Sequence, residues 1–174
     1  KEEFRKVVNE AVTSYNAGRI DEAIEGFREA VNRKPQYPDI RCRLAIALGE
    51  LERYEEAVSE LNEALQINPN YVDALFFKGV FSLKLGKYRD ATETLKRAAE
   101  LREDYWDVRC YLGIAYFKRG MFDECRDELT HVVDSNPTYC LAHYYLGMAH
   151  LSSGRTGSSP TTPKRTREYP RRRP

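Results

Sequence analysis

The sequence has little that would support metal or cofactor chemistry. Its 174 residues include three histidines and four cysteines, with no Cys-x-x-Cys or His-x-x-x-His pair. His143 and His150 are two helical turns apart, about 10 Å along a helix, which is too far for one metal ion without further ligands. A Gly-rich phosphate loop is missing as well. We therefore expect no metal site and no cofactor.

A catalytic site is not expected either. Cys140 lies one helical turn before His143, so a thiol–imidazole pair is conceivable. Nothing in the sequence supplies a third group to orient that pair or an oxyanion hole beside it. The sequence therefore predicts a protein that is not an enzyme.

Long apolar runs are also missing. None approaches the roughly 20 residues that a membrane-spanning helix needs. The N-terminal segment, Lys1 to Phe4, does not resemble a signal peptide. Cysteines without paired spacing are typical of reduced thiols in a reducing compartment. These features predict a cytoplasmic protein.

The net charge is small but unevenly distributed. The whole chain has a formal charge of +1, whereas residues 155–174 contain seven basic side chains and one acidic side chain. That segment is rich in Pro, Ser and Thr and nearly devoid of apolar residues, so burial cannot offset its chain entropy. We expect a folded domain over residues 1–154 and a disordered basic tail over residues 155–174. A solubilising or artefactual extension is the favoured explanation of the tail.

What the chain does have is an internal repeat, with a period of about 34 residues. Equivalent positions hold the same kind of residue in four full units and one partial unit. The columns are Ala11, Ala45, Gly79, Gly113 and Gly147; Ala23, Ala57, Ala91 and Cys125; Phe27, Leu61, Leu95 and Leu129; Tyr37, Tyr71, Tyr105 and Tyr139; and Pro35, Pro69 and Pro137. A period of this length is typical of a solenoid of stacked units.

Each unit predicts two amphipathic helices. In the second unit, the apolar residues of segments 44–51 and 57–65 both follow the spacing of one helical face. Gly18, Gly86, Gly120 and Gly154 are expected at the turn between the helices, where a backbone of positive φ ends the first helix. A proline then ends the second helix in three of the four units. The small columns are expected where the two helices approach closely.

These features resemble the tetratricopeptide repeat family. The resemblance rests on the length of the unit, the small columns, the aromatic residue before the second helix and the closing Asn-Pro at 68–69 and 136–137. It implies an all-α, right-handed α-solenoid of four tandem helix-turn-helix repeats and a capping helix. The expected units are residues 4–37, 38–71, 72–105 and 106–139, with a partial unit at 140–154.

In this family the first helices of successive units line a concave surface that binds peptides, which implies a groove here. The matching residues are Val8, Val12, Tyr15, Cys42, Ile46, Phe76, Val80, Leu83, Cys110, Ile114, Phe117, Tyr144 and Met148. One row is apolar in every unit: Val12, Ile46, Val80, Ile114 and Met148. Packing between the two helices of a unit does not require it, because other columns already supply those contacts. Alternatively, these residues only fill the space between neighbouring first helices.

We therefore expect a protein–protein interaction scaffold that buries apolar side chains of a partner peptide or helix in this groove. Two other functions stay open. The incomplete fifth unit leaves an open end near Leu146, Met148 and Leu151, through which copies of the chain could stack into filaments. Binding of nucleic acid or an anionic surface by the basic tail is less favoured, because the tail lacks interleaved aromatic residues.

Overall fold

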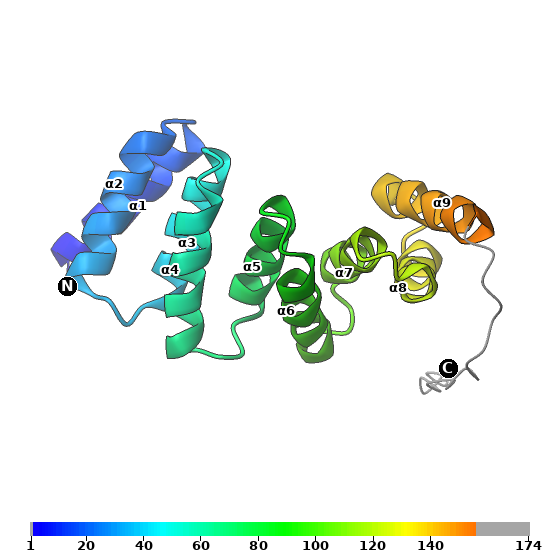
Figure 1. Cartoon of the computed structure of the whole chain (residues 1–174). Helices are drawn as coiled ribbons and strands as arrows, with labels where there is room; N and C mark the ends of the chain where they lie inside the picture. The colour runs from blue at the N-terminus through cyan, green and yellow to red at the C-terminus, as the bar shows by residue number, and fades with distance from the viewer. Residues whose placement is uncertain (1, 156–174) are drawn as a thin grey trace, which may run out of the picture.

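The fold consists of helices stacked side by side in a row (Figure 1). A computed structural model describes residues 2–155, which contain nine α-helices and no strand. The helices are α1 (Glu2–Asn16), α2 (Ile20–Arg33), α3 (Pro38–Glu50), α4 (Tyr54–Ile67), α5 (Val72–Lys84), α6 (Tyr88–Leu101), α7 (Trp106–Lys118), α8 (Phe122–Ser135) and α9 (Cys140–Arg155). Within this part of the chain, no helix is both long and apolar enough to cross a membrane. The predicted all-α solenoid of four helix pairs and a final helix is confirmed.

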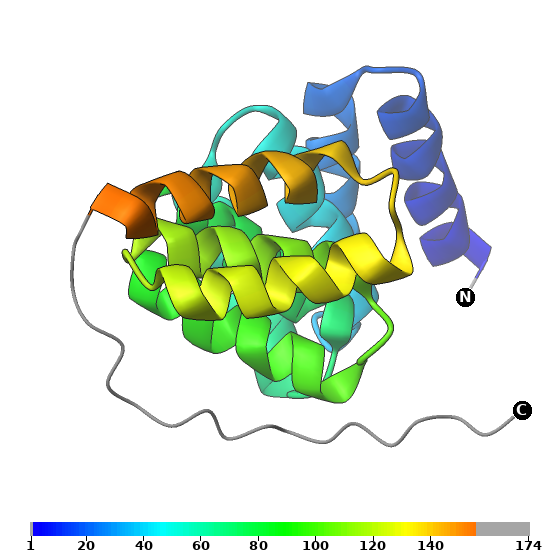
Figure 2. The ribbon, with the colours of Figure 1, turned by 90° about the vertical axis from the view of Figure 1, so that its right-hand side faces the viewer.

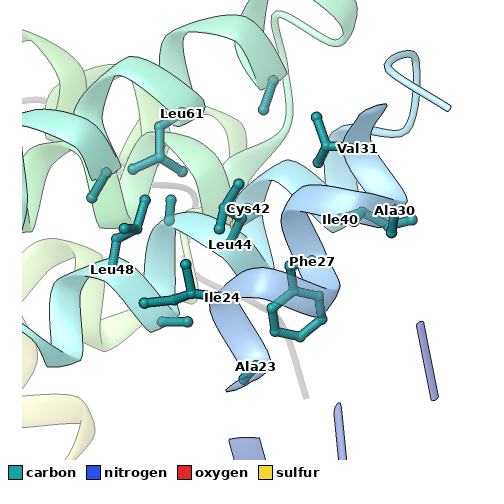
Figure 3. Close-up of a cluster of buried hydrophobic side chains, with 14 of the residues drawn as sticks. Ala23, Ile24, Phe27, Ala30, Val31, Ile40, Cys42, Leu44, Leu48 and Leu61 are labelled. Atoms are coloured by element: carbon teal, nitrogen blue, oxygen red, sulfur yellow. The ribbon is translucent and has the colours of Figure 1, made fainter. Parts of the chain in front are cut away.

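Each helix packs mainly on its neighbours in the sequence. The closest pairs are α1 with α2, α3 with α4, α5 with α6, and α7 with α8, and the second helix of each pair also packs on the next unit. Figure 2 looks at the row from its C-terminal end, with α8 and α9 nearest the viewer. Figure 3 shows part of the core, where Phe27, Leu44 and Leu61 come from three successive helices. The core therefore continues from unit to unit along the row, as in other repeat proteins.

The small columns lie where the two helices of a unit cross. A Cβ atom added to Gly79 would come within 2.4 Å of Cγ of Leu95, and one added to Gly113 within 2.6 Å of Cδ2 of Leu129. Both leucines are fully buried. The columns of small residues and of leucines are therefore two sides of one contact, which holds each pair of helices at close range.

The turns between paired helices use a left-handed backbone. Gly18, Gly86 and Gly120 have φ angles of +76°, +72° and +73°, and Glu52 adopts +57° at the same position of the second unit. The expectation of a turn at Gly154 is wrong, because α9 continues through this residue to Arg155. The described residues contain no second helix after α9, so nothing there requires the chain to reverse direction at Gly154.

The row of helices has an inner wall and an outer wall. Among the first helices, α3 contacts α5, α5 contacts α7, and α7 contacts α9 directly. Direct contacts between the backbones of successive second helices are sparse at most in the described part of the chain. Long side chains join them instead, as in the ion pair between Arg28 of α2 and Glu56 of α4 at 3.1 Å. The first helices therefore form the crowded inner wall.

Two largely buried arginines fasten successive units together. The Nη1 of Arg109 donates to Glu128 at 2.9 Å, and its Nε donates to the carbonyl oxygen of Glu103 at 2.9 Å. The side chain of Arg109 is 7% exposed, so these charge-assisted bonds are shielded from water. Arg41 makes the matching ion pair to Glu60 at 2.8 Å. Arg109 thus ties the loop that ends the third unit to both helices of the fourth.

Replacing Gly79 with Ala is expected to destabilise the fold. Overpacking against Leu95 costs about 1–3 kcal/mol, which should exceed the gain of roughly 1 kcal/mol from exchanging Gly for Ala in a helix. Gly147→Ala is the matched control, because Gly147 occupies the same column in α9 and a Cβ there meets nothing within 4 Å. Thermal unfolding followed by circular dichroism should show a lower midpoint for Gly79→Ala and a higher midpoint for Gly147→Ala. Midpoint shifts of the same sign would contradict this explanation of the small columns.

Candidate binding surface on the inner wall

The residues predicted for the groove lie along the inner wall at different depths. Cys42, Cys110 and Ile114 are buried, with exposed fractions of 2%, 0% and 7%, and Tyr144 is exposed. The remaining nine are half-buried: Val8, Val12, Tyr15, Ile46, Phe76, Val80, Leu83, Phe117 and Met148. The accessible apolar surface is therefore most continuous over α1, α3 and α5.

The two cysteines lie beneath this wall. A tyrosine at the end of the same unit lies near each thiol: Tyr71 near Cys42, and Tyr139 near Cys110. Burial raises the pKa of each of these thiols to about 12. Both thiols are buried, so a partner on the surface cannot reach either sulfur without disturbing the packing around it. We therefore leave Cys42 and Cys110 out of the binding surface.

Two hollows flank Ile46 on the inner wall. The first has a volume of about 120 Å³ and is lined by Val12, Tyr15, Asn16, Phe27, Arg43 and Ile46. The second has a volume of about 240 Å³ and is lined by Ile46, Gly49, Glu50, Glu52, Tyr54, Phe77, Phe81 and Lys84. Pockets for drug-sized molecules usually measure about 300–1,000 Å³. The hollows are therefore suited to individual side chains of a larger partner.

The second hollow exists because a large and a small residue have changed places between two neighbouring columns. Gly49 stands where other units carry Tyr15, Leu83 or Phe117. Phe81 stands where other units carry Thr or Ala, and a Cβ added to Gly49 would lie 2.3 Å from its Cζ. The ring of Phe81 thus enters the space that a side chain at position 49 would take. The Phe81 ring therefore forms the floor of the second hollow, with open space above it.

A column of aromatic residues on the inner wall was not predicted. Phe77, Tyr111 and Tyr145 occupy equivalent positions of three successive units and are half-buried, and each contacts an aromatic residue of the predicted groove. Ring centroids are 5.1 Å apart for Phe76 and Phe77, 5.5 Å for Phe76 and Tyr111, and 5.4 Å for Phe117 and Tyr145. Their regular spacing in the sequence was a signal that could have identified them.

Charged side chains border both hollows. Arg43 lines the first, and Lys84, Glu50 and Glu52 line the second, all four exposed to solvent. Neither Arg43 nor Lys84 forms an ion pair with an acidic residue in the described part of the chain. Burial raises the pKa of the Tyr15 hydroxyl, and the negative charge of the nearby Glu50 adds to the effect. The edge of the first hollow therefore presents a cation to a partner, and the edge of the second presents one cation and two carboxylates.

Two residues considered for metal binding or catalysis, His143 and Cys140, hydrogen-bond instead to the backbone of the loop before α9. The Nε2 of His143 donates to the carbonyl oxygen of Pro137 at 2.8 Å, and the thiol of Cys140 donates to that of Thr138 at 3.5 Å. Among residues 2–155, no three His, Cys, Asp or Glu side chains are grouped to hold a metal ion. His143 and Cys140 thus bond to the loop backbone, and no hydrogen bond joins them to each other.

Paired helices of similar length that cross closely at small residues define the class of helical-repeat proteins. The sequence profile of the tetratricopeptide repeat matches residues 15–76, 50–101 and 82–151. These windows cover more than half of the sequence, so the chain belongs to the tetratricopeptide repeat family. A comparison with curated protein sequences gives no match.

Solved structures share this fold at low sequence identity. MamA from Desulfovibrio magneticus RS-1 has a TM-score of 0.84 and 22% identity, over 88% of this chain and 87% of that chain. A further crystal structure of MamA has a TM-score of 0.82 and 18% identity, over 87% and 82%. YrrB, described as a TPR protein with an unusual peptide-binding site, has a TM-score of 0.76 and 22% identity, over 85% and 76%. At such identities the likeness concerns the fold.

Thiol labelling tests how deeply the cysteines lie. Cys140 is exposed and the other three are buried, with burial raising the pKa of Cys125 to about 11. Because the thiolate is the reactive form, the three buried thiols stay protonated and shielded at pH 8. Iodoacetamide followed by mass spectrometry should modify Cys140 at least tenfold faster than Cys42, Cys110 or Cys125, and all four at similar rates in guanidinium. Equal rates for Cys42 and Cys140 in the folded protein would contradict a closed inner wall.

Proposed function

We propose that the inner wall binds a short apolar segment of a partner protein, with side chains of that segment seated in the two hollows beside Ile46. The observation that carries this proposal is the pair of adjacent hollows, built by half-buried apolar residues of α1, α3 and α5. Such residues are only half removed from water, and a partner that covers them gains about 25 cal/mol per Å² of apolar area. The protein would act as an interaction scaffold.

The spacing of the hollows limits the partner's sequence. Successive first helices lie about 8–10 Å apart, which is the usual distance between packed helices. Two apolar residues seven positions apart on a helix span about 10.5 Å, and residues three apart in an extended segment span about 10 Å. The exposed Arg43 favours an acidic residue of the partner close to the first hollow.

YrrB supports a role in binding. Its described peptide-binding site shows that this fold can hold a peptide, and the chain matches most of the length of YrrB. We infer a non-enzymatic role, because the inner wall presents apolar rings and two cations but no nucleophile paired with a base. The four free cysteines favour a reducing location such as the cytoplasm. Residues 156–174 of the basic tail lie outside the described residues, so nucleic-acid binding is not part of this proposal.

Peptides selected from a random library against the whole chain provide the test. Ile46→Asp places a charge between the two hollows. It should weaken the binding of the selected peptides more than tenfold, a loss of more than about 1.4 kcal/mol in binding free energy, measured by calorimetry. Ile67→Asp is the matched control, because Ile67 is 41% exposed at the end of α4, away from the hollows. Ile114 is unsuitable for such a test, because it is buried and a charge there would disturb the fold.

Circular dichroism should show the same helix content in both variants. Selected peptides that bind the Ile46→Asp variant as tightly as the original chain would contradict the proposal, and so would equal losses for both variants.

A further inference from the structure

Helix α9 carries an apolar stripe that the rest of the described chain leaves uncovered. The stripe consists of Leu141, Tyr144, Met148 and Leu151, whose spacing by three and four positions places them along one face of the helix. Leu141, Tyr144 and Leu151 have exposed fractions of 37%, 61% and 68%, and Met148 is half-buried. Figure 2 shows α9 at the end of the row. We call these four residues the α9 stripe.

The preceding unit shows what this face is built to receive. The positions of α7 that match Tyr144 and Met148 are Cys110 and Ile114, and both are buried. The two helices α7 and α9 contact each other directly, and Tyr145 of α9 packs on Phe117 of α7 at 5.4 Å between ring centroids. In α7 this face is therefore covered at these two positions, where the next first helix packs on it. The α9 stripe is the same face without its cover.

Residues 156–174 offer few apolar side chains for such a cover. Residues 156–174 contain one large apolar residue, Tyr169, and otherwise Gly, Ser, Thr, Pro and charged residues. Leu146, which we expected at the open end, packs into the core with Ala142 and Ala149 instead. The surface left for a partner is therefore the α9 stripe itself.

The opposite end of the row does not match the α9 stripe. Where α3 buries Ile40, Leu44 and Ala47 against the preceding unit, α1 carries Lys6, Glu10 and Thr13. All three of these α1 residues are exposed, and Lys6 pairs with Glu10 at 3.9 Å. Head-to-tail stacking would bury charged groups of α1 against the apolar stripe, at a cost in free energy. Filaments built through the open end are therefore disfavoured.

We propose that the α9 stripe pairs with the α9 stripe of a second copy, in antiparallel orientation about a two-fold axis. Between residues 140 and 154, α9 contains no Asp, Glu, Lys or Arg, so two stripes meet without repulsion between like charges. The spacing by three and four positions is that of the seam between paired helices. Since a two-fold interface is self-complementary, Leu141 contacts Leu151 of the second copy, and Tyr144 contacts Met148.

Sedimentation of the full chain tests the dimer. The original chain should sediment as a dimer over a concentration series, and Tyr144→Glu combined with Leu151→Glu should make it a monomer with unchanged helix content. Leu101→Glu is the control, because Leu101 is 40% exposed at the end of α6, outside the stripe, and this variant should stay dimeric. A monomeric original chain, a dimeric double variant, or assemblies that grow beyond the dimer would each overturn the proposal.

Disulfide cross-linking tests the antiparallel register. In the proposed pairing Cys140 lies beside residue 151 of the second copy, whereas the two Cys140 residues are about 18 Å apart along the helices. Under mild oxidation, Leu151→Cys should therefore give a covalent dimer, and the original chain should not, since a disulfide needs Cα atoms within about 7 Å. Adding Cys140→Ser to Leu151→Cys should abolish the cross-link. A cross-link that survives this change, or none with Leu151→Cys, would overturn the register.

Discussion

The structure depends on the close crossing of the two helices in each unit. Gly79 against Leu95 and Gly113 against Leu129 leave no room for even a methyl group, and the same position holds the small residues Ala11 and Ala45 in the first two units. Units of similar shape stack in a regular row, which places their first helices in one wall. The binding surface therefore follows from a packing constraint that involves none of its own residues.

The inner wall is regular in its backbone but irregular in its side chains. The exchange of bulk between Gly49 and Phe81 opens a hollow on one side of Ile46, while Ile114, in the same column as Ile46, is buried. Binding specificity in a repeat protein arises from such departures, because the repeated residues are needed for stacking. The end of the row follows the same logic: Tyr144 is exposed where its counterparts Cys42 and Cys110 are covered by the next unit.

Most of the fold could be predicted from the sequence, because the columns correspond to contacts that every unit makes. The turn expected at Gly154 is wrong, since glycine permits a turn but a second helix must follow to require one. The binding surface was harder to predict. Column analysis treats all units alike, whereas burial differs within one column: Cys42 and Cys110 are buried, Phe76 is half-buried and Tyr144 is exposed. Arg41 and Arg109 were missed because they recur only in alternate units and so form no column through the whole row.

The central claim is that a partner contacts the inner wall around Ile46. Methyl NMR during titration with a selected peptide tests it most directly, because Val12, Ile46 and Val80 report on the wall, whereas Ile67 and Val133 lie on second helices. The account predicts that the largest shift changes fall on Val12, Ile46 and Val80, with little change at Ile67 and Val133. The largest changes at the second-helix methyl groups, with Ile46 unaffected, would contradict it.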